Sequence, residues 1–210
     1  MKKTPSRLIT LLILLIIPLL FFFYYKKKID AIPENAKKIP VLFDAPSFHY
    51  VTQNGDSLSS DSLKGSIYVA DFIFTTCGSV CPELSKTMAQ LQQNFKDNPE
   101  VKLVSFSIDP VRDSIPALKD YAARYGAMKG KWFFLRGDTT SVWRMAEEGF
   151  KVPVVYTPEG GLGSEFTHTE RIALVDMEGK VRGLYNGLDK DQLDSLYNNI
   201  GMLIVASKNL

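Results

Sequence analysis

The two cysteines of the chain, Cys77 and Cys81, are its most reactive side chains, and three residues separate them. Two cysteines this close can form a disulfide, exchange electrons with another thiol pair, or hold a soft metal ion between two thiolates. The Cys-x-x-x-Cys spacing differs from the Cys-x-x-Cys of thioredoxin-type oxidoreductases. Four positions along a helix would also place both side chains on one face. The spacing alone therefore leaves a metal site, a redox pair and a permanent structural disulfide open.

Histidine is another side chain that suits such a site, and the chain has two, His49 and His168. His168 lies in Glu-Phe-Thr-His-Thr-Glu-Arg, at the end of a long loop and just before a predicted strand. Oxidoreductases of the thioredoxin fold place a cis-proline in that region, but no proline lies between Pro158 and the strand here. We therefore predict His168 to be a third ligand and His49 to be a structural or surface residue.

Two thiolates and one imidazole form a soft set of three ligands. Structural zinc nearly always takes four ligands, and the chain has no third cysteine. Reduced copper accepts thiolates at low coordination number, and copper(II) accepts imidazole together with sulfur. The ligand set therefore favours copper over zinc. Two aspartates are secondary: Asp109 is interpreted as part of a strand-ending turn, and Asp71 either tunes the site, is a satisfied buried carboxylate, or faces a sheet edge.

The cysteines lie where a predicted strand meets a predicted helix. Residues 67–74 form an apolar run typical of a buried strand, and apolar residues after Pro82 recur at helical spacing through residue 95. Proline is favoured at the start of a helix, where N–H groups lack partners and the dipole favours negative charge. We therefore expect thiolates with lowered pKa values here. An inert disulfide gains nothing from this position, which favours a redox or metal role.

Strands and helices alternate along the rest of the domain, and the last two strands form a hairpin. This order predicts an α/β domain with a mixed central sheet flanked by helices. A cysteine pair after the first core strand makes the expected architecture thioredoxin-like, with the loops at the carboxyl ends of the strands meeting in one place. The predicted strands are 48–52, 67–74, 101–108, 132–135, 171–176 and 181–185, and the predicted helices are 82–95, 115–125, 139–148 and 193–203, with a long loop over 152–166.

The N-terminal region differs from the rest in charge and hydropathy. Residues 1–40 carry eight basic and two acidic residues, so in a chain of net charge +2 the remainder is slightly acidic and gives no reason to expect nucleic acid as a partner. Residues 8–25 form an uncharged 18-residue segment, long enough to span a bilayer, and aromatic residues and lysines end it. We predict an uncleaved transmembrane anchor over 1–28 rather than a signal peptide, a linker over 29–40 and a domain over 41–210.

Four motifs together resemble the SCO/SenC family over about residues 46–205. They are Asp-Phe-Ile-Phe-Thr-Thr-Cys-Gly-Ser-Val-Cys-Pro (71–82), Ser-Ile-Asp-Pro-Val-Arg-Asp (107–113) with the helix over 118–126, Phe-Thr-His-Thr (166–169), and the final hairpin (172–176 and 181–185). Members of that family are membrane-tethered, thioredoxin-fold copper chaperones that assist the dinuclear copper site of cytochrome c oxidase subunit II. The resemblance implies copper(I) or copper(II) bound by Cys77, Cys81 and His168, a partner that is this subunit or a related copper protein, and a domain on the periplasmic face of a bacterial cytoplasmic membrane.

The chain departs from the family pattern at three positions close to the predicted ligands. Gly78 stands where a proline is common, and it loosens the turn between the cysteines. Thr167 and Thr169 flank the histidine, where many members have Asp and Ser. None of these changes removes a ligand, and they bear on copper affinity and on the preferred oxidation state.

Two other functions compete with a copper chaperone. One is an enzyme, a thiol–disulfide reductase that keeps the copper-ligand cysteines of the oxidase subunit reduced, with Cys77 and Cys81 as its redox pair and Cys77 as the nucleophile. The other is a peroxidase, which has no support because neither cysteine is paired with the residues that a peroxidatic thiolate needs. His168 separates the first two functions, since a copper site needs it and a reductase does not.

Overall fold

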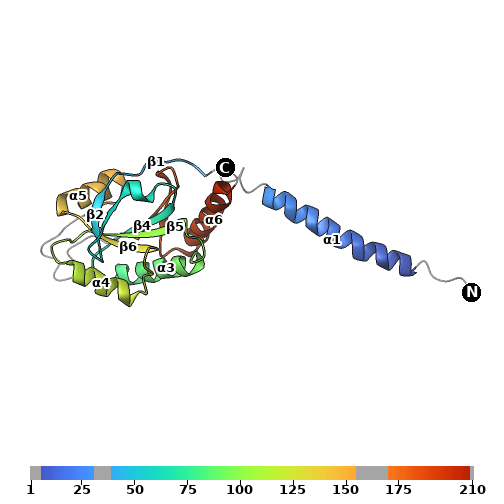
Figure 1. Cartoon of the computed structure of the whole chain (residues 1–210), viewed down its shortest axis with the longest axis horizontal. Coiled ribbons are helices and arrows are strands. Elements are labelled where there is room, and N and C mark those ends of the chain that lie inside the picture. The colour runs from blue at the N-terminus through green and yellow to red at the C-terminus, as the bar shows by residue number, and fades with distance from the viewer. Residues whose placement is uncertain (1–5, 31–38, 155–169, 209–210) are drawn as a thin grey trace, which may run out of the picture.

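An eight-stranded sheet forms the centre of the structure, a computed structural model that describes residues 6–30, 39–154 and 170–208 (Figure 1). Its strand order is β1-β8-β7-β4-β5-β6-β2-β3. The strands are β1 Phe43–Asp44, β2 His49–Thr52, β3 Ser57–Ser59, β4 Ile67–Ile73, β5 Val101–Ser107, β6 Trp132–Arg136, β7 Arg171–Val175 and β8 Lys180–Asn186. Strands β4, β5 and β6 are parallel and the other pairings are antiparallel. The predicted mixed sheet with a final hairpin is confirmed.

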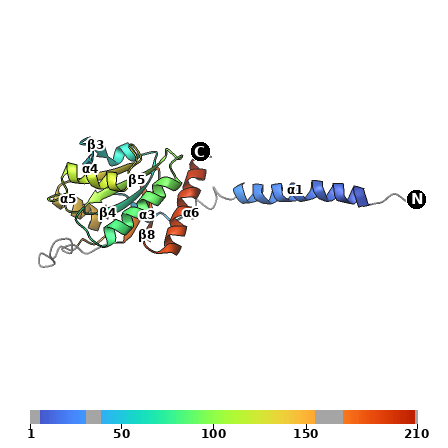
Figure 2. The ribbon, with the colours of Figure 1, turned by 90° about the horizontal axis from the view of Figure 1, so that it is seen from below.

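Helices cover both faces of this sheet, as Figures 1 and 2 show. On one face, Tyr121 of α4 packs on Phe134 of β6 with ring centroids 5.9 Å apart. Helices α3 and α6 lie beside α4 on this face. On the other face, Phe150 lies 5.7 Å from Phe72 of β4 and follows the π-helical segment η2. The helices are α1 Ser6–Asp30, α3 Val80–Asn94, α4 Ile115–Arg124, α5 Thr139–Arg144 and α6 Lys190–Ser207, with the 3₁₀ turn η1 Ser60–Leu63 and η2 Met145–Gly149.

The central strand β4 is buried on both faces along its whole length. A parallel strand covered by helices on both faces has a nearly continuous apolar sequence. Residues 67–73 have this pattern with one exception, Asp71. Strand β4 pairs with β5 on one side and with β7 on the other, so Asp71 lies in the middle of the sheet and not at an edge. The carboxyl end of β4 leads directly into the turn that contains Cys77 and Cys81, called the cysteine turn below.

The predicted elements are present with small shifts at their ends. Helix α3 begins at Val80, two residues before the predicted start, so Pro82 is its third residue. Helix α5 ends at Arg144 and continues as η2, where the prediction had one helix. The two-residue strand β1 was not predicted, because only its long-range pairing with β8 defines it. Most of the predicted loop over 152–166 lies outside the described residues.

The N-terminal helix α1 lies apart from the sheet and its helices in Figures 1 and 2. Its large apolar side chains between Leu12 and Tyr25 are exposed, at 44–68% of their full area. Within the described part of the chain, no helix combines the length and the apolar character that a membrane crossing requires.

Candidate metal centre

Cys77 and Cys81 lie in the turn that leads from the carboxyl end of β4 into α3. The Cys77 N–H donates to the Phe74 carbonyl at 3.2 Å, which closes the first part of the turn. Cys81 is the second residue of α3, and Cys77 precedes the helix. Both side chains are buried, 6% and 5% exposed, and no disulfide joins them. The predicted place between strand and helix is confirmed, although the two sulfurs do not share a helix face because Cys77 is not helical.

The Cys77 sulfur takes the place of a capping side chain at the start of α3. The Ser79 side chain makes no capping hydrogen bond there. Instead, the Cys81 N–H donates to the Cys77 Sγ, with 3.4 Å between nitrogen and sulfur. The N–H groups and the dipole at a helix N-terminus favour negative charge on such an acceptor. The other helices of the domain are capped conventionally, by Ser114, Asp138 and Asp189.

The two thiols are not equivalent. The pKa of Cys81 is raised far above its usual value. The largest cause is its hydrogen bond with Cys77, and the second is burial. The backbone of Phe74 opposes this shift and the charge of Asp71 adds to it. The expectation of a lowered pKa is therefore wrong for Cys81, because the neighbouring sulfur and the loss of solvent outweigh the helix N-terminus. The raised pKa keeps the proton on Cys81.

The structure places the two histidines very differently. His168, the predicted third ligand, lies outside the described residues. His49 is exposed in β2, and strands β5 and β6 separate that strand from β4. Among the residues that the structure describes, no group of three or more His, Cys, Asp and Glu side chains is arranged to hold a metal ion. The described part of the site is therefore a pair of thiols.

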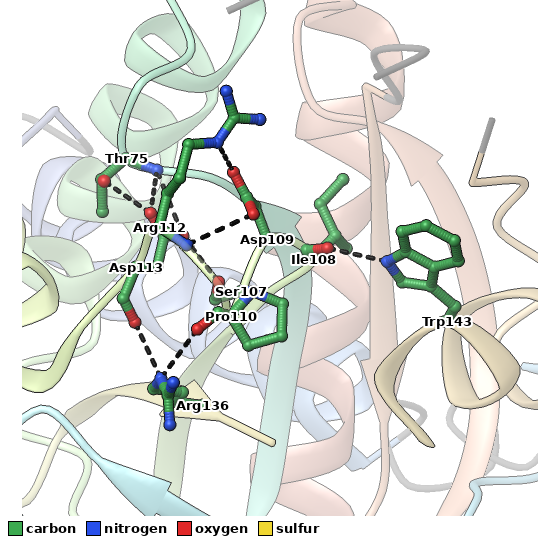
Figure 3. A network of polar contacts seen from close by, with 9 residues as sticks. All are labelled: Thr75, Ser107, Ile108, Asp109, Pro110, Arg112, Asp113, Arg136 and Trp143. Carbon is green, nitrogen blue, oxygen red and sulfur yellow. Dashed lines mark hydrogen bonds and ion pairs between the residues drawn. The ribbon is translucent and has the colours of Figure 1, made fainter. Parts of the chain in front are cut away.

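The loop after β5 contacts Thr75, which lies two residues before Cys77 (Figure 3). Asp113 in this loop is fully buried, and its carboxylate accepts the Thr75 N–H at 3.0 Å and the Thr75 hydroxyl at 2.5 Å. It also accepts the Ser107 hydroxyl at 2.6 Å. Burial raises the pKa of Asp113, while these donors oppose the shift. Sequence reasoning missed Asp113, although it is the last residue of the motif over 107–113.

Asp109 was interpreted as part of a strand-ending turn, and it lies two residues after the end of β5. Its carboxylate forms an ion pair with Arg112 and also accepts the Arg112 N–H at 3.4 Å. The Asp113 N–H donates to the Asp109 carbonyl at 2.9 Å, which closes the turn. Asp109 thus shapes the loop from which Asp113 reaches the cysteine turn.

Asp71 is a buried carboxylate in the middle of the sheet, on the strand that leads to the cysteines. Neither of its oxygens has a hydrogen-bond partner among the described residues. Ser105 lies opposite it on β5, and the Ser105 oxygen accepts the Trp132 indole N–H at 2.9 Å. Burial raises the pKa of Asp71 to about 7, and the Ser105 hydroxyl offsets this only in part. Of the three interpretations of Asp71, the edge position is wrong, and among the described residues no hydrogen bond of ordinary geometry reaches the carboxylate, although the Ser105 hydroxyl lies close enough to lower its pKa.

The described residues support two kinds of chemistry. Two thiols separated by one turn of chain can close as a disulfide and reopen by exchange with an external thiol. Once deprotonated, they form a soft dithiolate that suits copper. Both sulfur-bearing side chains are buried, whereas Thr76, Gly78 and Ser79 in the same turn are exposed.

Comparison with known proteins places this geometry in a family. The family model described as SCO1/SenC matches residues 42–203. A SCO1/SenC family lipoprotein from Bacillus anthracis str. Ames is 30% identical with a TM-score of 0.71, over 78% of this chain and 96% of that one. BsSco, described as a member of the Sco family of cytochrome c oxidase assembly proteins with a disulfide switch, is 33% identical with a TM-score of 0.69, over 79% and 95%.

A more distant likeness supports the fold alone. ScoI of Bradyrhizobium japonicum, solved with copper bound, is 23% identical with a TM-score of 0.60, over 76% of this chain and 99% of that one. Together these likenesses confirm the predicted thioredoxin-like α/β architecture of the domain.

Proposed function

Because this chain belongs to the SCO1/SenC family, we propose that it binds copper and assists the assembly of cytochrome c oxidase. The observation that carries the proposal is the buried pair Cys77 and Cys81, in which the Cys81 N–H donates to the Cys77 sulfur. The two thiols form a soft donor set at the N-terminus of α3, and soft donors favour copper over harder metal ions. BsSco, which is described as a member of a family of cytochrome c oxidase assembly proteins, supports the same function.

The copper ligands in this proposal are Cys77, Cys81 and His168. Two thiolates satisfy copper(I), and the imidazole of His168 adds the nitrogen that copper(II) prefers. Copper is cargo here: the chain holds it and passes it on. The proposed recipient is the dinuclear copper site of cytochrome c oxidase subunit II or of a related copper protein.

The proposed location is the periplasmic face of a bacterial cytoplasmic membrane. A similar protein of Bacillus anthracis is described as a lipoprotein. In this chain both cysteines lie in the thiol pair, so no cysteine near the N-terminus is available for lipid attachment. The apolar segment over 8–25 would then provide the attachment, with residues 1–28 as anchor, 29–40 as linker and 41–210 as the copper-binding domain.

Metal titration of the reduced protein tests the copper site. We expect one copper per chain, held in preference to zinc, with sulfur-to-metal charge-transfer absorption in the copper(II) form. Replacing His168 with Ala should weaken copper(II) binding strongly and copper(I) binding less. His49→Ala is the matched control, because His49 is the other histidine and lies exposed in β2, and it should behave as wild type. Preference for zinc over copper would refute the proposal.

A thiol–disulfide reductase is the second candidate function, and the closeness of the two thiols favours it. Oxidase assembly in cells separates the two candidates. A copper chaperone needs His168, so His168→Ala should reduce assembly about as much as Cys77→Ser. If His168→Ala assembles the oxidase normally while Cys77→Ser does not, the reductase is the better description.

A further inference from the structure

We propose that Asp113 is a positioning residue for the thiol pair: through Thr75, its carboxylate fixes where Cys77 stands. The role in copper binding rests on the function proposed above, whereas the role in placing the two sulfurs does not. Asp113 lies 36 positions after Cys77 in the chain, so only the fold brings it to the cysteine turn.

The contact with Thr75 is direct and involves both backbone and side chain. Thr75 lies two residues before Cys77, and both its N–H and its hydroxyl donate to the Asp113 carboxylate (Figure 3). The next turn bond runs from the Cys77 N–H to the Phe74 carbonyl. The segment from Phe74 to Cys77 is thus held at Thr75 by the carboxylate and at Phe74 by its own turn. An ionised carboxylate accepts hydrogen bonds only, which matches a ring of donors.

Asp113 itself is held rigidly from the other side. The Arg136 Nε on β6 donates to the Asp113 carbonyl at 3.1 Å and to the Pro110 carbonyl at 3.0 Å. The Trp143 indole N–H on α5 donates to the Ile108 carbonyl at 2.7 Å. Figure 3 shows these contacts converging on the loop over 108–113. Strand β6 and helix α5 therefore help to fix the position of Cys77 through this loop, although neither element carries a cysteine.

The consequence for function is pre-organisation. The short turn holds the Cys77 sulfur where the Cys81 N–H can reach it. A Cβ added at Gly78 in this turn would meet nothing within 4 Å among the described residues, so no neighbouring side chain packs against the turn at that position. A site fixed by supporting hydrogen bonds binds metal more tightly than one whose ligands must first be ordered. Asp113 supplies that support from the neighbouring loop.

The test compares two variants that remove different hydrogen bonds from the same carboxylate. Thr75→Val removes the hydroxyl that links Asp113 to the cysteine turn and keeps the side-chain shape. Ser107→Ala removes the hydroxyl that links Asp113 to the end of β5. Thr75→Ser restores the hydroxyl and serves as the rescue variant. These variants avoid Asp113→Ala, which leaves buried donors unpaired and is expected to unfold the loop.

Three quantities are measured on reduced, full-length protein: thermal stability, copper(I) affinity, and the equilibrium constant for closing the Cys77–Cys81 disulfide against glutathione. Thr75→Val should lower copper affinity about tenfold and shift the disulfide equilibrium several-fold. Ser107→Ala should lose comparable thermal stability but keep both other values, and Thr75→Ser should keep all three. The proposal is overturned if Thr75→Val leaves both sulfur-dependent values unchanged, or if Ser107→Ala changes them as much. If wild type binds no copper, the proposed function fails, while the disulfide equilibrium still tests the positioning role.

Discussion

The backbone N–H of Cys81 donates to the sulfur of Cys77, at 3.4 Å. One cysteine therefore serves as the cap of the helix that carries the other. The Cys77 sulfur receives the favourable field of the helix N-terminus, and Cys81 lies inside the helix beyond it. This asymmetry assigns different chemistry to two residues that look equivalent in the sequence.

Alkylation should reveal this asymmetry. With reduced, metal-free protein near pH 8, iodoacetamide should modify Cys77 before Cys81, because the pKa of Cys81 is raised by its Cys77 partner and by burial. Peptide mass spectrometry over a time course measures the order. The variants Cys77→Ser and Cys81→Ser, each with one remaining thiol, provide the individual rates. Earlier modification of Cys81 would contradict the proposed distribution of the proton.

The buried carboxylate of Asp71 should make stability fall as pH rises. Its pKa is about 7 in the folded protein, above the ordinary 3.8, so between these values the folded state keeps a proton that the unfolded chain has lost. Asp71→Asn should therefore gain stability over wild type progressively from about pH 4 to pH 7, by a few kcal/mol in total, on the order expected for a shift of this size. Urea unfolding of the reduced protein at several pH values measures the gain.

Asp138→Asn is the control of opposite sign. The Asp138 carboxylate caps α5, and its hydrogen bond with Ser141 lowers its pKa. Its contribution to stability is present above the unfolded pKa and is lost as pH falls. Asp138→Asn should therefore differ most from wild type at neutral pH, as a loss. A pH-independent difference for Asp71→Asn would show that the pKa of this group is the same in the folded and unfolded states.

Two glycines offer a matched test of how tightly α3 is seated. A Cβ at Gly187 would clash with the Leu84 Cδ1 of α3 and lie 2.6 Å from the Ile172 Cδ1, so Gly187→Ala should overpack this contact and cost about 1–3 kcal/mol. A Cβ at Gly201, inside α6, would meet nothing within 4 Å. Gly201→Ala should stabilise the protein by up to about 1 kcal/mol, since alanine is the better helix former. Thermal unfolding of both variants measures these changes in stability. If both substitutions change the stability equally, α3 can shift to accommodate the methyl group at residue 187.

Membrane fractionation tests the proposed anchor. If the uncharged apolar segment over 8–25 is the anchor, the full-length protein should stay with membranes through high-salt and alkaline washes. A chain shortened to begin at residue 32 should be soluble, folded and able to bind copper. Removal of the full-length protein by alkali would indicate surface attachment, and release of a shorter native form would indicate a cleaved signal.

Local sequence patterns were sufficient for the elements of this fold and for its reactive pair. Apolar runs and helical spacing predicted the main strands and helices, because these depend on residues close in the chain. The cysteine pair at the strand-to-helix junction followed from the same signals. The pairing of β1 with β8 did not, because its register depends on residues more than a hundred positions apart.

The electrostatics of the site depended on the tertiary structure. A sequence shows that Asp71 and Asp113 are acidic. It does not show that Asp71 is buried with no hydrogen bond of ordinary geometry from the described residues, or that Asp113 accepts hydrogen bonds from Thr75 beside the cysteines. Likewise, proximity to a helix N-terminus suggested two acidic thiols, and the structure assigned the raised pKa to Cys81. The reason is that desolvation and hydrogen bonding depend on neighbours from other strands and loops, which only the folded chain brings together.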